Sequence, residues 1–393
     1  MLRPGVAIVG DVSFPVVGVV GGGQLARMMA PAAIALGVRL RVLARDATDS
    51  AAQVVPDVDV GDERDLDALR RFAKGCDVLT FDHEHVPTDH LRQLQRDGVV
   101  VRPDPDALVH AQDKSVMRAR LTALGVPCPR WLLVGRVEEL DAFGADVGWP
   151  VVLKTPRGGY DGKGVRVVGS AEEARDWLRT LGPGEQLLAE ERVRFGRELA
   201  VLVARSPHGQ AAVYPVVETV QVDGICREVL APAAISEAHA VSAQAVALHI
   251  AGGLGVTGML AVEMFDTDAG VLVNELAMRP HNSGHWTIEG ARTSQFEQHL
   301  RAVLDLPLGE TTMTAAHVAM SNVLGGAIED MYAGYLHCMA HDPGVHLHMY
   351  GKAVRPGRKV GHATTLGEDA DDVRARARHA AAFLRGDSDG TAE

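Results

Sequence analysis

The chain has 393 residues, of which 47% are hydrophobic and 23% charged, and its formal net charge is −12. This composition excludes a largely disordered chain and is typical of a globular protein with two or more domains. The acidic balance argues against a nucleic-acid partner, and the sequence has no apolar run of the roughly 18 residues that a membrane span requires. The four widely separated cysteines favour a reducing, cytoplasmic compartment.

Residues 16–103 alternate between strand-like and helix-like segments. Apolar runs typical of buried strands occur at residues 16–20, 39–43, 77–81 and 98–101. This alternation predicts a doubly wound, Rossmann-like α/β domain. The first strand is followed by GGGQLA, which fits a phosphate-binding turn at a helix N-terminus. A plain tight turn and a nicotinamide site remain open, although Asp46 is poorly placed for the latter.

The remaining chain changes its pattern several times. Pro103 and Pro105 interrupt the alternation, and one helix is expected from there to Leu124. A compact α+β pattern covers residues 151–204, and a β-hairpin is expected at 259–275. The last helix places acids first and arginines later, which suits the helix dipole. We expect four structural units, at residues 16–110, 111–193, 194–310 and 311–386. Residues 1–15 and 387–393 would be extensions outside these units.

A second glycine-rich segment, KTPRGGYDGKG, begins at Lys154 and lies between two predicted strands. Its backbone N–H groups can surround phosphates, and Lys154 can add a positive charge. No helix follows it, so it is not a P-loop of the Walker type. The alternative interpretation is a hairpin loop with solvated charges.

Glu263 and Glu275 form the third candidate feature. The turn DTDAG predicts a hairpin centred on Ala269, which would place the two glutamates opposite each other on one face. Like charges in such positions are unfavourable without a cation. Mg²⁺ prefers carboxylates together with phosphate oxygens, so a magnesium–nucleotide complex would resolve the conflict. Exposure of both residues on a solvent face is the alternative.

Three polar segments complete the set. RPHNSGHW begins at Arg279 and suits recognition of a small planar anion, although zinc ligation by His281 and His285 remains open. YGKAVRPGRKVGH begins at Tyr350 and forms a basic cluster in an acidic protein, which suggests binding of a phosphate or a developing anion. DHEH, which contains Glu84, indicates a loop that faces a ligand, or plain surface polarity.

In this order, these motifs resemble the N5-carboxyaminoimidazole ribonucleotide synthetases, a family of the ATP-grasp superfamily. The resemblance covers roughly residues 16–366, and RPHNSGHWT with TSQFEQH is its most specific part. It implies an ATP-grasp fold, mixed α/β and α+β, with an N-terminal pre-ATP-grasp domain, a small lid and a C-terminal α+β domain. ATP would lie between the lid and the large domain.

The resemblance also implies a reaction. ATP and bicarbonate would form carboxyphosphate, which carboxylates 5-aminoimidazole ribonucleotide and releases ADP and phosphate, in purine biosynthesis. The implied cofactors are ATP and Mg²⁺, with Mn²⁺ as the alternative ion. The implied partners are these small molecules and a second copy of the chain in a homodimer. Electrostatic preorganisation would be the main catalytic effect, with the lid excluding water.

Residue roles follow from the matching positions. The catalytic group consists of Arg279, His281, Asn282 and Lys352. Mg²⁺ would be held by Glu263 and Glu275. The ribonucleotide contacts are expected at Gln24, Glu84, Tyr160, Asp161, Lys352 and Arg358. The ATP contacts are expected at Lys114, Lys154, Gly159, Tyr160, Asp161, Gly162, Lys163, Gly164, Val165, Glu190, Glu191, Arg192, Val193, Glu198, Asn274 and Glu275.

The sequence departs from the family pattern at a few positions. Gln221 stands where many relatives have His, Val165 replaces a frequent Gln, and Asp82 replaces a frequent Glu. None of these removes a predicted metal ligand or phosphate-binding lysine. Three other functions are alternatives to this carboxylation: that of a related ligase that uses formate, that of a catalytically inactive nucleotide-binding protein, and that of a nicotinamide-dependent dehydrogenase. The intact Glu pair, Lys154 and Arg279 argue against the inactive protein.

Overall fold

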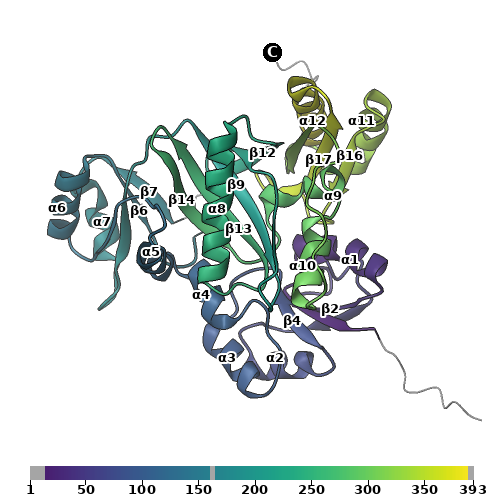
Figure 1. The fold of residues 1–393 in the computed structure, drawn as a ribbon, viewed down its shortest axis with the longest axis horizontal. Coiled ribbons are helices and arrows are strands. Elements are labelled where there is room, and N and C mark those ends of the chain that lie inside the picture. The colour runs from purple at the N-terminus through teal and green to yellow at the C-terminus, as the bar shows by residue number, and fades with distance from the viewer. Residues whose placement is uncertain (1–13, 160–163, 388–393) are drawn as a thin grey trace, which may run out of the picture.

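A computed structural model describes residues 14–159 and 164–387 of the chain. Within these ranges the chain forms three β-sheets that are covered by helices (Figure 1). This mixture of a parallel α/β sheet with antiparallel α+β sheets confirms the predicted fold class. In the same ranges, no helix combines the length and the apolar character needed to cross a membrane.

The N-terminal sheet is parallel and has the strand order β3-β2-β1-β4. Its strands are β1 (Val16–Val20), β2 (Arg39–Ala44), β3 (Asp57–Val60) and β4 (Val78–Phe81). Its helices are α1 (Gln24–Leu36), α2 (Leu66–Ala73) and α3 (Thr88–Arg96). The strand expected at 98–101 was wrong: the segment makes one bridge, between Leu79 and Val101. Strand β3 was not predicted, because its sequence, DVDV, contains no apolar run.

Two helices connect this sheet to the rest of the chain. We expected one helix up to Leu124, but the structure has α4 (Pro105–Gln112) and α5 (Lys114–Ala123). The break lies at Asp113, whose backbone is extended and whose carboxylate accepts hydrogen bonds from the N–H groups of Ser115 and Val116. Asp113 therefore caps a new helix. As a result, Lys114 lies in the first turn of α5.

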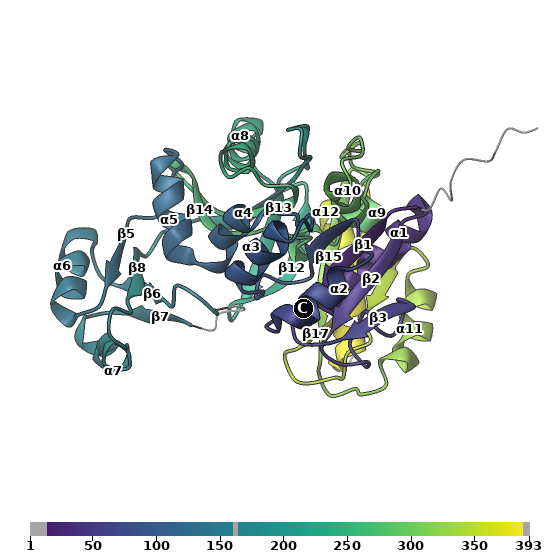
Figure 2. The ribbon, with the colours of Figure 1, turned by 90° about the horizontal axis from the view of Figure 1, so that it is seen from below.

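A small antiparallel sheet follows, with the strand order β5-β8-β6-β7. Its strands are β5 (Trp131–Val134), β6 (Val151–Lys154), β7 (Val165–Val168) and β8 (Leu187–Glu191). Helices α6 (Val137–Val147) and α7 (Arg175–Arg179) cover it, and α7 is shorter than the sequence predicted because a 3₁₀ turn precedes it at Glu172–Ala174. This unit projects to one side of the molecule (Figures 1 and 2).

The largest sheet contains nine strands within the described ranges, and its main path is β14-β13-β9-β11-β12-β15-β17-β16. They are β9 (Arg197–Arg205), β10 (Ala211–Val213), β11 (Val217–Val222), β12 (Ile225–Ala231), β13 (Gly258–Thr267), β14 (Gly270–Ala277), β15 (His317–Leu324), β16 (His346–Met349) and β17 (Lys359–Gly367). Because β12 pairs with β15, the boundary that we proposed at 310 lies between strands of one continuous sheet. The domain boundaries stay predictions.

Helices lie on both faces of the large sheet. They are α8 (Glu237–Gly253), α9 (Thr287–Gly290), α10 (Gln295–Val303), α11 (Tyr335–His341) and α12 (Ala370–Arg385). Strand β9 explains how both faces become buried. Leu199 and Val201 point into one apolar cluster, whereas Ala200 and Leu202 point into another on the opposite face. Alternation along a strand therefore supplies two cores.

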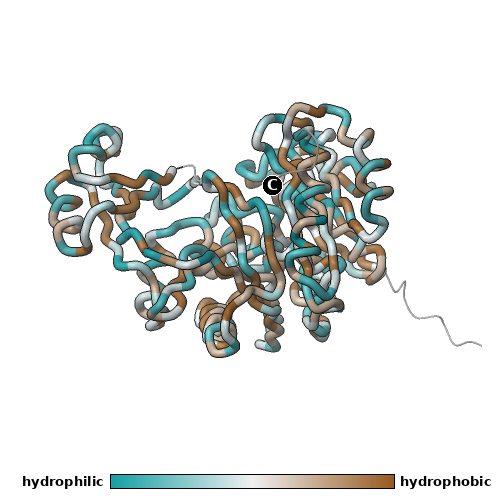
Figure 3. The backbone as a smooth tube through the Cα atoms, turned by 90° about the horizontal axis from the view of Figure 1, so that it is seen from above, coloured by the Kyte–Doolittle hydropathy of each residue, from teal (hydrophilic) through white to brown (hydrophobic). Residues whose placement is uncertain are grey.

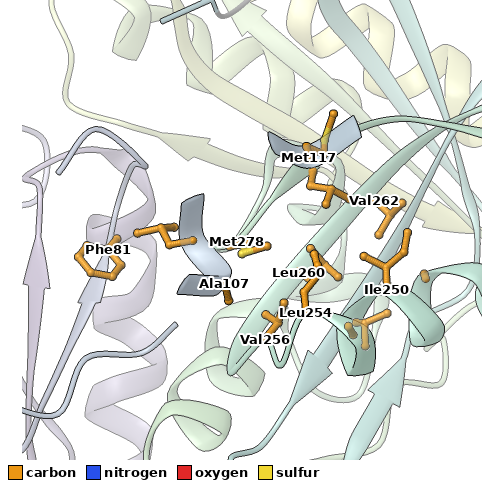
Figure 4. Packing of buried hydrophobic residues seen from close by; sticks show 14 of the residues in the cluster. Phe81, Ala107, Met117, Ile250, Leu254, Val256, Leu260, Val262 and Met278 are labelled. Atoms are coloured by element: carbon orange, nitrogen blue, oxygen red, sulfur yellow. The ribbon is translucent and has the colours of Figure 1, made fainter. Parts of the chain in front are cut away.

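One apolar cluster joins the N-terminal sheet to the large sheet. It runs from Phe81 on β4 through Ala107 and Met117 to Leu260 on β13 and Ile250 on α8 (Figure 4). All of these residues are buried. In the hydropathy view, apolar segments run through the middle of the molecule, and hydrophilic segments are frequent at its ends (Figure 3). The shared core fixes the position of the N-terminal sheet beside the residues that form the candidate site.

Candidate active site

Glu263 and Glu275 lie directly opposite each other on β13 and β14, as predicted, but the turn is centred between Asp268 and Ala269 and not on Ala269. The register shifts immediately after Glu263, so the strand is irregular beside the pair. Burial, together with the nearby Glu275 and Glu198 carboxylates, raises the pKa of Glu263 to about 7. Burial and like charge thus outweigh the opposing positive charges of Lys359 and Arg279, and a bound cation would favour the ionised form. Two oxygen ligands on one face, with Asn274 next to Glu275, fit the needs of a divalent metal ion.

Two lysines lie beside this pair. Lys114 Nζ is 2.7 Å from Glu275 Oε1. Lys154 Nζ lies 3.1 Å from Asn274 Oδ1 and 2.7 Å from Glu190 Oε2. These contacts bring together residues from α5, β6, β8 and β14. The cluster therefore combines fixed positive charge for phosphates with carboxylates for a metal ion, as the sequence analysis expected.

Arg118 is the main residue that the sequence analysis missed. Its side chain is completely buried, and Nε is 2.6 Å from Glu190 Oε1. Its two terminal nitrogens donate to the carbonyl oxygens of Val273 and Asn274 on β14. Arg118 follows Lys114 by four residues on α5, so both lie on one helix face. That spacing was the available signal.

Glu190 does not present a free side chain. Burial alone would raise its pKa, but Lys154 and Arg118 on either side hold the pKa of Glu190 below its usual value. Any contact of Glu190 with an adenine ring would therefore come from its backbone. Its neighbour Glu191 accepts a hydrogen bond from the N–H of Arg130, and Arg192 is exposed.

Val193 and Glu198 come next along the chain. Val193 precedes the large sheet, and Glu198 lies near the start of its strand β9. Burial raises the pKa of Glu198, and the positive charge of Lys154 opposes that change. Glu198 pairs with Phe265 in the ladder between β9 and β13, two residues from Glu263. The predicted ribose-binding residue therefore lies close to the predicted metal ligands.

The glycine-rich loop is described at its two ends. The N–H of Lys114 donates to the Pro156 carbonyl, which holds the start of the loop against α5. At the other end, Gly164 has φ +73°, and a Cβ atom there would collide with the Thr155 hydroxyl. Gly159 and Val165 lie within the described ranges, whereas Tyr160, Asp161, Gly162 and Lys163 lie outside them.

Arg279 connects the large sheet to the N-terminal domain. Its Nε is 2.8 Å from Glu84 Oε2, although the two residues are 195 positions apart in the chain. Glu84 is the central residue of the DHEH segment, so that segment does face the candidate site. The neighbouring rings of His83 and His85 stack on each other at a centroid distance of 5.3 Å.

His281 lies close to the glutamate pair. Its Nε2 is 3.6 Å from Glu263 Oε1, and its Nδ1 is 2.9 Å from the Ser283 hydroxyl. Burial, with the positive charges of Arg279 and Lys359, lowers the pKa of His281 to about 3. The ring is therefore neutral at physiological pH, and it can offer one N–H and one lone pair.

Two buried amides, which the sequence analysis also missed, position the loop that carries His281 and Asn282. Gln295 accepts a hydrogen bond from the His281 N–H and donates one to the His281 carbonyl, both at 2.8 Å. Asn322 exchanges side-chain hydrogen bonds with Asn282 at 2.8 and 2.9 Å. Gln295 also contacts Nδ1 of His285, so one amide side chain holds both the His281 backbone and the His285 ring.

Gln24 and Lys352 come together from opposite ends of the chain. Lys352 Nζ donates to the Gln24 side-chain oxygen, and it also lies 5.7 Å from the centre of the Tyr350 ring. Gln24 is the first residue of α1, where the Asp82 carboxylate accepts from the Ala26 N–H. Gly23 is required there, because a Cβ atom would collide with that carboxylate.

Arg358 lies farther from this group. It is exposed, and its guanidinium donates to the carbonyl of Ala353 in its own loop. Arg358 therefore belongs to the basic segment, but its described contact does not bring it to Gln24 or Lys352. Its expected contact with the ribonucleotide stays a prediction.

Three family models match consecutive parts of the chain. The ribonucleotide synthetase preATP-grasp domain matches residues 15–112, and the ATP-grasp domain matches residues 119–296. The C-terminal domain of phosphoribosylaminoimidazole carboxylase matches residues 318–376. The preATP-grasp match covers the parallel sheet, the ATP-grasp match covers the small sheet and strands β9–β14, and the third match covers the C-terminal strands of the large sheet.

Curated relatives match over nearly the whole chain. The N5-carboxyaminoimidazole ribonucleotide synthase of Mycobacterium tuberculosis is 56% identical over 94% of this chain and 88% of its own length. The enzyme of the same name from Corynebacterium ammoniagenes is 47% identical, over 94% and 92% of the two chains.

Solved structures give the same result. The N5-carboxyaminoimidazole ribonucleotide synthetase of Thermus thermophilus superposes with a TM-score of 0.85 at 41% identity, covering 94% of this chain and 99% of the other. The Aspergillus clavatus N5-carboxyaminoimidazole synthase, solved with ADP and 5-aminoimidazole ribonucleotide, superposes with a TM-score of 0.85 at 33% identity, over 95% and 99% of the chains. The chain belongs to the N5-carboxyaminoimidazole ribonucleotide synthase family of ATP-grasp enzymes.

Proposed function

We propose that this chain carboxylates 5-aminoimidazole ribonucleotide at the expense of ATP, with bicarbonate as the carbon source. The products would be N5-carboxyaminoimidazole ribonucleotide, ADP and phosphate, as a step of purine biosynthesis. The observation that carries this proposal is the junction at Arg279. This residue follows the Glu275 strand on one side, and on the other side it contacts Glu84 from the N-terminal domain.

On the nucleotide side, Lys114 and Lys154 would bind the phosphates of ATP. Glu263 and Glu275, with Asn274 beside them, would hold Mg²⁺ or Mn²⁺, and the bound ion would neutralise phosphate charge. The described ends of the glycine-rich loop adjoin Lys154 at the end of β6 and Val165 at the start of β7, so both ends lie beside the expected phosphates. The backbone near Glu190 and Val193 would contact adenine, and Glu198 would accept hydrogen bonds from the ribose.

The chemistry would proceed in two steps. A bicarbonate oxygen attacks the γ-phosphorus of ATP, which forms carboxyphosphate and releases ADP. The exocyclic amine of the ribonucleotide then attacks the carboxyl carbon, or CO₂ released from it. Phosphate leaves with the electrons of the broken C–O bond, and the proton lost by the amine passes to phosphate or to water. The positive charges of Arg279 and Lys352 would stabilise the anionic intermediate. The neutral ring of His281 would orient it by donating a hydrogen bond.

On the acceptor side, Gln24, Glu84 and Lys352 would contact the ribonucleotide. Their places at the N-terminus of α1 and beside Tyr350 support this assignment, because a helix N-terminus and a lysine together favour a phosphate group. The homodimer and the cytoplasmic location implied by the resemblance are part of the same proposal.

The activity can be tested directly by phosphate release from magnesium–ATP. We expect strong stimulation when 5-aminoimidazole ribonucleotide and bicarbonate are present together, matched by disappearance of the ribonucleotide. Replacing bicarbonate by formate separates this activity from that of a related ligase. ATP binding without stimulated phosphate release would contradict the proposed reaction.

Replacing Glu275 with Gln tests the metal assignment. The change removes one carboxylate charge from the pair and the partner of Lys114, so we expect phosphate release to fall by about 10²-fold or more. Circular dichroism should show an intact fold. Asp268→Asn is the matched control, because it makes the same chemical change at an exposed position of the same hairpin. Near-normal turnover of Glu275→Gln would refute the assignment.

The raised pKa of Glu263 predicts a pH dependence of metal binding. Below a pH of about 7 the carboxyl group is protonated, and a cation must displace that proton. Affinity for Mn²⁺, measured by electron paramagnetic resonance without nucleotide, should therefore rise up to about pH 7 and then level off. Glu263→Gln should bind weakly and remove this dependence. The same steep rise in Glu263→Gln would show that another group is responsible.

Replacing Lys352 with Ala tests the ribonucleotide side. Loss of a hydrogen bond from a charged donor costs about 1.5–3 kcal/mol, so the KM for the ribonucleotide should rise by roughly 10-fold or more. The KM for ATP should change little. Lys74→Ala, at an exposed position at the end of α2, is the control. An equal loss of apparent affinity for ATP would place Lys352 on the nucleotide side instead.

A further inference from the structure

Three histidines meet on the surface of the C-terminal part of the fold. His337 and His341 lie four residues apart on α11, and His379 lies on α12. His337 Nε2 is 3.0 Å from His379 Nε2, and one ring nitrogen from each of the three residues lies within 4.8 Å of the others. Helices α11 and α12 lie on the far side of the large sheet from the small sheet of β5–β8 (Figure 1). This cluster has no role in the proposed reaction.

Packing holds the three rings in place. The His337 ring stacks on Phe383 at a centroid distance of 3.7 Å and an interplanar angle of 11°. The His341 ring stacks on His379 at 4.2 Å and 28°. Cys338, which lies between the two α11 histidines, is buried, and its thiol lies 3.8 Å from the Ala380 carbonyl oxygen on α12. The thiol therefore anchors α11 to α12, and the imidazoles remain at the surface.

The type and spacing of these side chains favour metal binding. Each imidazole offers a ring nitrogen, and histidine is the commonest metal ligand in proteins. Two histidines four residues apart on one helix face form the established spacing for a shared zinc ion. His337 and His341 are exposed, so an ion could reach them from the solvent.

The separations are compatible with a single ion. Zn–N bonds of about 2.0–2.1 Å place two ligand nitrogens roughly 3.4 Å apart in tetrahedral geometry. The nitrogens of His337 and His379 are already near that separation, at 3.0 Å. All three ligand nitrogens lie within 4.8 Å of one another, so the His341 ring needs only a modest movement to reach the same ion. Three imidazoles would leave the fourth position to water, and imidazole suits Zn²⁺, Ni²⁺ and Cu²⁺ better than Mg²⁺.

We propose that His337, His341 and His379 form a binding site for one divalent transition-metal ion, with Zn²⁺ as the natural ion. The ion would link α11 to α12 and would be separate from the carboxylate site at Glu263 and Glu275. The two sites differ in chemistry, because one offers three nitrogens and the other offers oxygens. This proposal does not depend on the proposed function.

The test uses Co²⁺ as a spectroscopic probe on the full chain without an affinity tag, followed by competition with Zn²⁺. We expect one equivalent of Co²⁺ per chain to bind at the three histidines and to show the visible absorption of nitrogen-ligated cobalt. His379→Ala should weaken binding by more than about 10-fold, because even residues that only support a metal ligand contribute that much. His346→Ala is the matched control, since His346 is an exposed histidine on neighbouring β16.

Two further variants make the result decisive. His337→Ala removes a ligand at an exposed helix position where alanine is well tolerated, so it gives the same test if the half-buried His379 proves necessary for folding. Glu275→Gln should keep the cobalt site, since its defect lies in the other centre. Binding that is unchanged in His337→Ala and His379→Ala, or lost in His346→Ala or Glu275→Gln, would overturn the proposal.

Discussion

Two carboxylates that face each other across one hairpin set the electrostatic problem that the rest of the active site solves. Glu263 and Glu275 are opposed by the register of β13 and β14, and like charges in that position destabilise a sheet. Lys114 compensates Glu275 at 2.7 Å. Glu263 lies 3.6 Å from a neutral histidine, and burial with the nearby carboxylates raises its pKa against the opposing charges of Lys359 and Arg279. Glu263 is therefore less well compensated than Glu275, and it lies beside the residues expected to bind the phosphates of ATP.

The buried Arg118 links the small sheet to the large one around this pair. It binds Glu190 on β8 and two backbone carbonyls on β14, so elements of different sheets share one guanidinium. Such an interaction is not a simple gain in stability, because taking the charges out of water costs about as much as their attraction returns. What Arg118 contributes is the relative placement of β8 and β14. Lys154 contacts the same Glu190 carboxylate, so Arg118 indirectly fixes the position of the lysine.

The sequence predicted features that depend on local geometry. Strands β1, β2 and β4 followed from short apolar runs, and the opposition of Glu263 and Glu275 was predicted correctly, although it depends on a register shift beside Glu263 that the turn sequence does not reveal. The break at Asp113 was missed, because helix periodicity continues through it. The partners Gln295 and Asn322 could not be predicted from spacing, since they act through contacts formed by the folded chain. Asn282 belongs to the RPHNSGHW motif, but its partner Asn322 lies 40 residues farther along the chain and outside every motif that the sequence singled out.

The same long-range contacts explain why the site lies where the domains meet. Ser50 donates to the Tyr350 carbonyl, Lys352 donates to Gln24, and Arg279 pairs with Glu84, so the N-terminal domain is attached at three places around the proposed acceptor site. Arg279 follows directly after the strand that carries Glu275. An intermediate formed beside the glutamate pair would therefore have only a short distance to travel before it reached groups supplied by the N-terminal domain. Carboxyphosphate hydrolyses readily, so this short distance would limit its exposure to water. The short distance is itself a consequence of Arg279, because this one residue joins the two domains.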